Sequence, residues 1–160
     1  MMILQLAEEL RQGMDWQTLT ERRVPWLIQN TFPFFSVDTL EYLQKGGRIG
    51  KVTAMAGTML QIKPLITFAA DGQLQSIAKV RGRNLVIRKL IELVTQSHNG
   101  AARYNLAVAN GGAPAEMEIL QGKLTTALPN YDHIWSGELD GTLSVYIGDG
   151  VLGAAVQRLE

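Results

Sequence analysis

The sequence predicts an α+β fold in which a mixed β-sheet packs against helices. Three observations indicate this class. Segments with helical spacing of apolar residues come first, two β-patterned segments then flank Asp71-Gly72, and strand-like and helical segments alternate in the remainder of the chain. This order fits an α+β or an α/β sandwich, of which we expect the first. No internal repeat or low-complexity linker divides the chain, so we expect a single domain over residues 1–160.

The N-terminal segment has the pattern of two helices. Residues 3–12 place apolar side chains at helical spacing, and Gly13 supplies a C-terminal stop. Asp15 is the predicted N-cap of the second helix, in which Pro25 indicates a kink or a new start. The apolar positions of the first helix are Ile3, Leu6, Ala7 and Leu10.

A short strand and a glycine-terminated helix follow. Residues 33–37 are rich in aromatic and β-branched residues and predict the strand. Asp38 is the predicted N-cap of the helix, which runs into Gly46-Gly47. A further helical stretch is expected over residues 52–60.

The segment around Asp71-Gly72 predicts a β-hairpin. Both residues tolerate the positive φ angles of a type I′ turn, which is why Asp-Gly between two β-patterned runs is a strong hairpin signal. Pro64 lies in the first arm and has no N–H to donate. The arm is therefore expected at a sheet edge, or to be irregular at that point.

The C-terminal half alternates between strand and helix patterns. Arg81-Gly82-Arg83 opens a helix over residues 84–96, which His98-Asn99-Gly100 ends, and Pro114 suits the first turn of a later helix. The elements expected after the first of these helices are a strand at 103–110, a helix at 114–128, strands at 133–139 and 142–148, and a loop with a short helix at 148–160.

Composition and charge disfavour several classes of function. Fifteen basic residues balance fifteen acidic ones, so the chain lacks the positive field that nucleic-acid binding usually requires. The absence of cysteine rules out disulfides and thiolate metal sites. No apolar run approaches the ~20 residues that span a bilayer, and acidic residues near the start do not suit a signal peptide. We therefore expect a cytoplasmic protein.

Two groups of residues have both a structural and a functional interpretation. Gly46-Gly47 forms a helix C-cap, or allows a close approach of the backbone to a group that Arg48 binds as a planar cation. Alternating Lys79, Arg81 and Arg83 project to one side of a strand, either as a charge-protected sheet edge or as a docking surface for an acidic partner.

Other candidate residues give weaker signals. His98 and His133 have no serine or carboxylate spacing typical of a catalytic triad, so we assign both to structural or surface roles. The sequence around Asp149 contains Gly148 and Gly150 but lacks a dinucleotide-binding fingerprint and a companion cluster of metal ligands. We therefore expect no cofactor, no metal and no enzymatic activity.

The string from residue 38 to residue 83 carries a family resemblance. It reads DTLEYLQKGGRIGKVTAMAGTMLQIKPLITFAADGQLQSIAKVRGR. It resembles the C-terminal half of the DegV family of bacterial fatty-acid-binding proteins in four consecutive elements: a "tLeyLkkGGRI" motif, a "lLnIKPil" segment, a "dG" turn and a "kvRgr" end, in that order. The initial LAEELRQGMDWQTL and the final SVYIGDGVLGAAV resemble further parts of the family, so the resemblance covers nearly the whole chain.

The resemblance implies a fold, a ligand and a partner. Family members have an N-terminal α/β domain and a C-terminal α+β domain that hold a long-chain fatty acid between them, and some present it to a fatty acid kinase. The resemblance assigns residues 1–160 to the C-terminal lipid-binding domain, without the N-terminal domain. The fatty-acid-binding residues that it implies are Gly46, Gly47, Arg48, Ile49, Met59, Leu60, Ile62, Tyr146, Gly148 and Gly150. Lys79, Arg81 and Arg83 are implied to dock the partner.

Two residues depart from the family pattern. Tyr146 stands where the family usually has a histidine, and Asp149 stands where it has proline; a phenol still donates a hydrogen bond, whereas a nearby aspartate repels a carboxylate. The alternative function is an interaction module that forms a homo-oligomer, or binds another protein, through the apolar surface that the absent domain leaves. The residues expected on that surface are Trp26, Phe32, Phe34 and Phe35.

Overall fold

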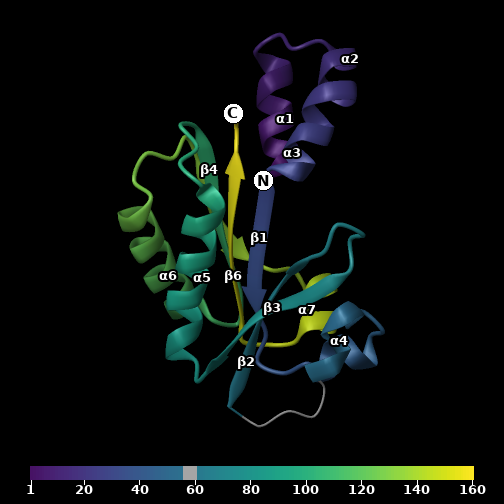
Figure 1. Ribbon diagram of the computed structural model, residues 1–160, viewed down its shortest axis with the longest axis vertical. Helices are drawn as coiled ribbons and strands as arrows, with labels where there is room; N and C mark the ends of the chain where they lie inside the picture. Colours follow the sequence, from purple (N-terminus) through teal and green to yellow (C-terminus); the bar gives the residue numbers. More distant parts are fainter. Residues whose placement is uncertain (56–60) are drawn as a thin grey trace.

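The computed structural model describes residues 1–55 and 61–160, which fold around one sheet (Figure 1). The strands are β1 Thr31–Ser36, β2 Ile62–Phe68, β3 Leu74–Arg81, β4 Tyr104–Gly111, β5 Ile134–Glu138 and β6 Val151–Arg158. The α-helices are α1 Met2–Arg11, α2 Trp16–Thr18, α3 Val24–Gln29, α4 Glu41–Lys45, α5 Asn84–His98, α6 Pro114–Ala127 and α7 Gly141–Ile147. A π-helical turn, η1 Leu19–Arg23, joins α2 to α3, and a 3-10 helix, η2, spans Gly50–Met55.

The sheet has six strands in the order β3-β2-β1-β6-β4-β5. Strand β4 pairs with β5 in parallel, and the other neighbouring pairs are antiparallel. The parallel pair is connected by α6, as expected for a βαβ unit. The predicted mixed sheet and α+β class are therefore confirmed.

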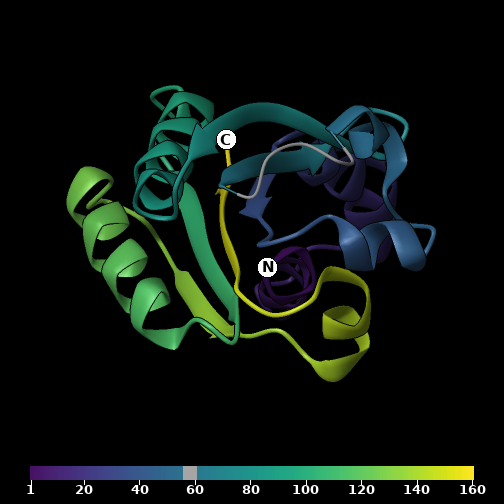
Figure 2. The same ribbon diagram turned by 90° about the horizontal axis from the view of Figure 1, so that it is seen from below.

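Helices α5 and α6 cover the first face of the sheet and bury the larger core (Figures 1 and 2). Alternate residues of the central strands point to this face, because side chains along a strand alternate between its two sides. The buried residues of this core are Phe34, Leu65, Val86, Leu90, Val94, Tyr104, Leu106, Val108, Leu120, Leu124, Leu128, Leu152, Ala154 and Val156.

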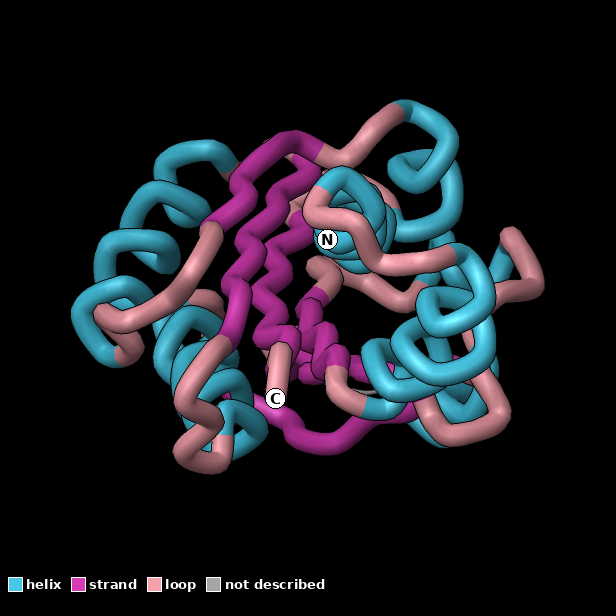
Figure 3. Tube along the Cα trace, turned by 90° about the horizontal axis from the view of Figure 1, so that it is seen from above, coloured by secondary structure: helices cyan, strands magenta, loops and turns pink. Residues whose placement is uncertain are grey.

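The second face is covered at its two ends. Helices α1 to α3 lie at the end where both chain termini are found, and α4 and α7 lie at the other end, as Figures 1 and 3 show. A smaller core lies at the α4 end and consists of Val37, Leu43, Val52, Ile66 and Val151. The strand residues between these two ends are the ones that form the candidate site.

The elements from residue 141 to the C-terminus differ from those predicted. Of residues 142–148, predicted as a strand, 142–147 belong to helix α7, whose N-cap Asp140 accepts a hydrogen bond from the backbone N–H of Leu143 at 3.0 Å. Residues 151–158, predicted as loop and helix, form β6 in the middle of the sheet. A strand buried on both faces has no polar alternation, so its apolar run cannot be distinguished from a helix by periodicity.

The hairpin is confirmed, but its turn is not of type I′. Strands β2 and β3 pair in antiparallel fashion around residues 69–73, and Gly72 has φ +79°. Asp71 has a negative φ, since Asn99 is the one non-glycine residue with positive φ in the described parts of the chain. The Asp71 carboxylate instead accepts a hydrogen bond from the N–H of Gln73 at 3.1 Å.

Pro64 lies in an inner strand rather than at a sheet edge. It pairs with Lys79 of β3, whereas the pairing of β2 with β1 begins at Leu65. A proline is tolerated there because no β1 residue lies opposite it. The predicted irregularity is confirmed by a register shift between Leu65 and Ile66.

Asp38 does not cap α4. The helix begins at Glu41, and the Asp38 carboxylate instead lies 3.0 Å from Lys63 Nζ and 3.2 Å from Arg83 Nη1. Two cations on neighbouring elements bind the carboxylate more strongly than an exposed helix end would. The predicted caps at Asp15 and Asn99 are confirmed: Asp15 Oδ1 accepts the Thr18 N–H at 2.9 Å, and Asn99 ends α5 in the left-handed conformation.

Candidate functional site

An apolar trough with a volume of about 720 Å³ lies on the second face of the sheet. Its floor comes from β1, β4 and β6, one wall from the β2–β3 hairpin and another from α7. Its lining includes Pro33, Phe35, Leu43, Gly47, Arg48, Gly50, Phe68, Leu74, Ala107, Ala109, Leu139, Leu143, Tyr146, Ile147, Val151, Gly153 and Ala155. A volume of this size is typical of small-molecule sites, which fall in the range of about 300–1,000 Å³.

Arg48 supplies a cation at the rim of this trough. Its side chain is exposed, its Nη1 donates to the Gly46 carbonyl at 2.8 Å, and its guanidinium lies 4.7 Å from the centre of the Tyr146 ring. The carbonyl and the ring fix the guanidinium without neutralising it, because neither is an anion. An arginine held in this way can bind a carboxylate through two parallel hydrogen bonds.

Glycine and tyrosine pack reciprocally where α4 meets α7. A Cβ atom on Gly46 would lie 2.5 Å from Cδ1 of Tyr146, and a Cβ atom on Gly148 would overlap the ring of Tyr42. Each helix thus sends a tyrosine onto the glycine that follows the other helix. Gly46 and Gly148 serve this packing and, unlike Gly47, do not line the trough.

The loop that follows α7 is fixed at three successive positions. After Gly148, the Asp149 carboxylate lies against Gly112, and Asp38 occupies the space in which a Gly150 side chain would lie. The sequence suggested that Asp149 would repel a bound carboxylate. Asp149 does not line the trough, so this repulsion does not arise there. Gly150 has a packing role, since its φ is +78° and its N–H bonds the Gly111 carbonyl at 2.7 Å.

The remaining predicted pocket residues lie elsewhere. Ile49 and Ile62 pack against the smaller core and do not line the trough. Met59 and Leu60 lie outside the described residues. Of the residues expected to bind a fatty acid, Gly47, Arg48 and Tyr146 line the trough, and their role in binding stays a prediction.

Most of the lining was not predicted from the sequence. The aromatic wall consists of Phe35 and Phe68, whose ring centres are 6.4 Å apart, and the floor consists of small residues of β4 and β6. Strand β6 was predicted as a loop and helix, so its contribution was missed. Strand β4 was predicted, and its small residues at alternate positions, Ala107 and Ala109, could have indicated the floor of the trough.

The aromatic surface expected on an interaction module does not form as one patch. Phe34 is buried in the larger core, Phe32 lies under the Arg158 guanidinium at 4.6 Å, and Phe35 lines the trough. Trp26 lies beneath the Arg23 guanidinium at 4.8 Å. These four side chains therefore lie in different parts of the structure.

The basic residues of β3 do not all project to one side. Lys79 and Arg81 are exposed at alternate positions of this edge strand. Arg83 instead lies beyond the strand end after Gly82, which has φ +84°, and donates through Nε and Nη2 to Glu116 at 2.8 and 2.7 Å. The hydrogen bond to Glu116 raises the pKa of Arg83. The prediction that all three residues face one way is therefore wrong for Arg83.

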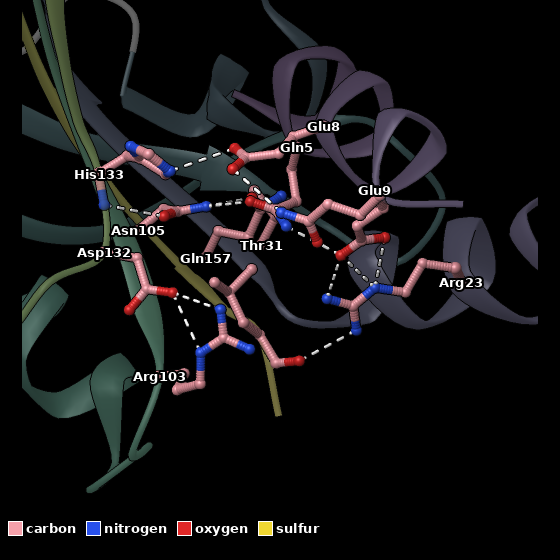
Figure 4. Close-up of polar contacts among 12 residues, drawn as sticks. Gln5, Glu8, Glu9, Arg23, Thr31, Arg103, Asn105, Asp132, His133 and Gln157 are labelled. Atoms are coloured by element: carbon pink, nitrogen blue, oxygen red, sulfur yellow. Dashed lines mark hydrogen bonds and ion pairs between the residues drawn. The ribbon is translucent and has the colours of Figure 1, made fainter. Parts of the chain in front are cut away.

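A group of buried polar residues, the polar wall, lies beneath α1 in the row of β4 and β6 that follows Ala107 and Ala155 of the trough floor (Figure 4). In the sheet, Thr31, Gln157 and Asn105 lie side by side, and Asn105 Nδ2 donates to Gln5 Oε1 at 2.8 Å. Gln5 in turn donates to Glu9 at 2.8 Å. The buried residues of α1 are Gln5 and Glu9, whereas Ile3 and Leu10 of the predicted apolar face are exposed and Leu6 and Ala7 are half-buried.

The two histidines have the structural surroundings expected of them. His98 Nε2 lies 2.9 Å from the Ala101 carbonyl at the end of α5, and His133 lies 3.2 Å from Glu8 of α1 and stacks on Trp135. Among residues 1–55 and 61–160, no cluster of three or more His, Asp and Glu residues could hold a metal ion. No helix in these ranges is long and apolar enough to span a membrane.

Comparison with known proteins identifies the family. The family model described as "Uncharacterised protein, DegV family" matches residues 1–159. The chain belongs to the DegV family. A DegV domain-containing protein from Clostridium acetobutylicum is 33% identical over 154 residues, which are 96% of this chain and 54% of the relative. The chain thus spans about half the length of the curated relatives it matches.

Solved DegV structures share the fold. A DegV family protein from Thermus thermophilus, described by its fatty acid binding, superimposes with a TM-score of 0.91 and 25% identity over 99% of this chain and 56% of that one. A stearic-acid-binding protein from Eubacterium ventriosum matches with a TM-score of 0.82 and 25% identity, over 98% of this chain and 54% of that one.

Proposed function

We propose that this chain binds a long-chain fatty acid, with the acyl tail in the trough and the carboxylate at Arg48. One observation carries the proposal: an apolar trough on the sheet has a single fixed guanidinium among its lining residues within the described parts of the chain. An alkyl chain requires the apolar surroundings of the trough, and a carboxylate requires the cation. Fatty acid binding by the Thermus thermophilus and Eubacterium ventriosum relatives supports it.

The two ends of the ligand contribute to affinity in different ways. Each methylene group buried in the trough contributes about 0.8 kcal/mol. A hydrogen bond to a charged group contributes about 1.5–3 kcal/mol, so Arg48 orients the ligand and adds to an affinity that the tail dominates. The trough is open on the side away from the sheet and leaves part of the tail in contact with solvent, so we expect this chain to bind more weakly than a two-domain relative.

Isothermal titration of the delipidated chain with hexadecanoate, supported by native mass spectrometry, tests the proposal. Arg48→Gln should weaken binding about tenfold or more, because it removes the charge from the carboxylate contact. Arg88→Gln is a matched control, since Arg88 is exposed on α5 and does not line the trough. Equal binding by the two variants would contradict the role of Arg48, and the absence of any uptake by the wild-type chain would contradict the function.

The role of the whole protein is part of the same proposal. We propose that residues 1–160 correspond to the C-terminal lipid-binding domain of a cytoplasmic, non-catalytic carrier that presents its fatty acid to a fatty acid kinase. The half-length match to curated relatives supports the domain assignment. Exposed Lys79 and Arg81 on the edge strand β3 are the proposed contact with an acidic partner. Their double replacement by Gln should weaken partner binding and leave hexadecanoate binding unchanged.

The rival function is self-association through the rim of the trough. It is favoured by Leu143 and Val145 of α7, which are 48% and 69% exposed. Light scattering across a range of concentrations separates the two. A monomer that binds hexadecanoate supports the carrier function, whereas a dimer that a Val145→Lys substitution dissociates supports self-association.

A further inference from the structure

The trough floor contains two adjacent rows of very small residues. The first row consists of Gly153 of β6 and Ala109 of β4, which are neighbours in the register of the sheet and line the trough; Gly137 of β5 continues this row beyond the lining. The second row, two residues further along, places Ala155 of β6 beside Ala107 of β4. Such rows lie about 6.8 Å apart, because a strand rises about 3.4 Å per residue.

Neither backbone conformation nor packing requires these glycines. A Cβ atom on Gly153 would approach no other atom closer than 3.4 Å, and one on Gly137 would have nothing within 4 Å. Neither glycine has a positive φ. Glycine inside a strand weakens it and often marks a place where a ligand approaches the backbone closely. The absence of a side chain at Gly153 therefore leaves space for a ligand in the trough above it.

The floor has a defined beginning and end along the strands. At one end are Val151 and α7, whose Tyr146 supports Arg48. At the other end the next row along β6 and β4 contains Gln157 and Asn105, which are fully buried and hydrogen-bonded beneath α1. Following β6 away from Arg48, a ligand passes Gly153 first, then Ala155, and then meets the polar wall.

We propose that the alanine row, Ala107 and Ala155, and the polar wall directly behind it together set the maximum acyl length that the trough accepts. The inference rests on the proposed function and adds the residues that select among its ligands. The methylenes nearest the carboxylate lie over the glycine row, and the distal ones lie over the alanine row. A polymethylene tail cannot continue past that row, because insertion between Asn105, Gln157 and Gln5 would leave their buried amides without hydrogen-bond partners.

Two substitutions at equivalent sites test this order. Ala107→Leu fills the distal row and should weaken hexadecanoate binding about tenfold or more, while decanoate binding changes less than about threefold. Ala109→Leu fills the proximal row. Its neighbours Gly153 and Gly137 leave room for the larger side chain, and the variant should bind both acids more weakly. Ala107→Val is a smaller step at the same position, and Ala115→Leu on the exposed face of α6 is the control for the change of side chain.

The measurement is isothermal titration of each delipidated variant with decanoate and with hexadecanoate. Retained decanoate binding shows that the Ala107 variant is folded, and Ala107→Val should give the same selective loss to a smaller extent. Equal losses for the two acids at Ala107, or no loss, would overturn the length assignment while the wild type still binds both. A wild-type chain that binds neither acid would instead refute the proposed function, and the assignment with it.

Discussion

Gly46 has no side chain, and the ring of Tyr146 occupies the space that one would fill. Its φ of −75° suits any residue, so the glycine is required by this contact and not by the backbone. We predict that Gly46→Ala displaces the Tyr146 ring and with it the guanidinium of Arg48. Hexadecanoate affinity should fall severalfold, and the free energy of unfolding should change by less than about 1 kcal/mol.

The matched control for this substitution is Gly122→Ala in α6. Nothing lies within 4 Å of a Cβ atom at that position, so the change should stabilise the helix by about 0.5–1 kcal/mol without affecting the ligand. Titration with hexadecanoate and urea denaturation of both variants make the comparison. Unchanged affinity in Gly46→Ala would show that the Tyr146 ring does not position Arg48.

The role of Tyr146 itself gives a second prediction at the scale of single residues. If the ring supports Arg48 through its face, Tyr146→Phe should bind hexadecanoate as the wild type does, whereas Tyr146→Leu should bind severalfold more weakly. A phenol that donated directly to the carboxylate would give the opposite result for Tyr146→Phe. Titration of both variants decides between these two contributions.

Among the elements, α7 determines much of the shape of the trough. It provides Leu143, Tyr146 and Ile147 to the lining, and its seven residues are too few to be stable without tertiary contacts and a cap. We predict that Asp140→Ala, which removes the N-cap hydrogen bond to Leu143, costs about 1 kcal/mol of unfolding free energy. Hexadecanoate binding should weaken as well, because the lining residues lose their fixed positions.

Asp15→Ala is the corresponding change at a helix that does not contact the trough. Asp15 accepts a hydrogen bond from Thr18 at 2.9 Å, so a similar loss of stability is expected, with unchanged ligand affinity. Denaturation and titration of both variants distinguish a local effect on the site from a general loss of stability. If both variants lost affinity equally, α7 would have no special role.

The same elements show how far sequence patterns determine the fold. Helices α5 and α6 and strands β4 and β5 were predicted because their apolar spacing, Pro114 and Asn99 agree with one another. Strand β6 was missed because it is buried on both faces, and α7 because its apolar residues suit a strand equally well. Asp140 at its N-cap was the available signal for a helix. The floor could not be predicted, because it depends on β6 lying between β1 and β4.

On the scale of the molecule, a continuous polar network joins the N-terminal helices to the middle of the sheet. Arg23 Nε and Nη2 donate to Glu9 at 2.8 and 2.7 Å, and Arg23 Nη1 donates to the Leu159 carbonyl at 3.0 Å. Through Gln5 the network reaches Asn105 of β4 (Figure 4). Because Gln5 and Glu9 are the buried residues of α1, the attachment of this helix depends on the hydrogen bonds that they make.

Protonation of Glu9 should therefore loosen this end of the molecule. Burial alone would raise the pKa of Glu9, but hydrogen bonds from Arg23 and Gln5, with the charge of Arg23, outweigh it and leave the pKa below its ordinary value. Since the folded state holds the proton less tightly than the unfolded state, the stabilisation is complete above the ordinary pKa and is lost as the pH falls through the folded value. Glu9→Gln should cost about 2 kcal/mol at neutral pH.

The difference in unfolding free energy between wild type and Glu9→Gln should shrink as the pH falls below about 4. Urea denaturation of both proteins across this range measures it, with Glu118→Gln on the exposed face of α6 as the matched carboxylate control. A constant difference at every pH would show that the ion pair contributes nothing to the attachment of α1.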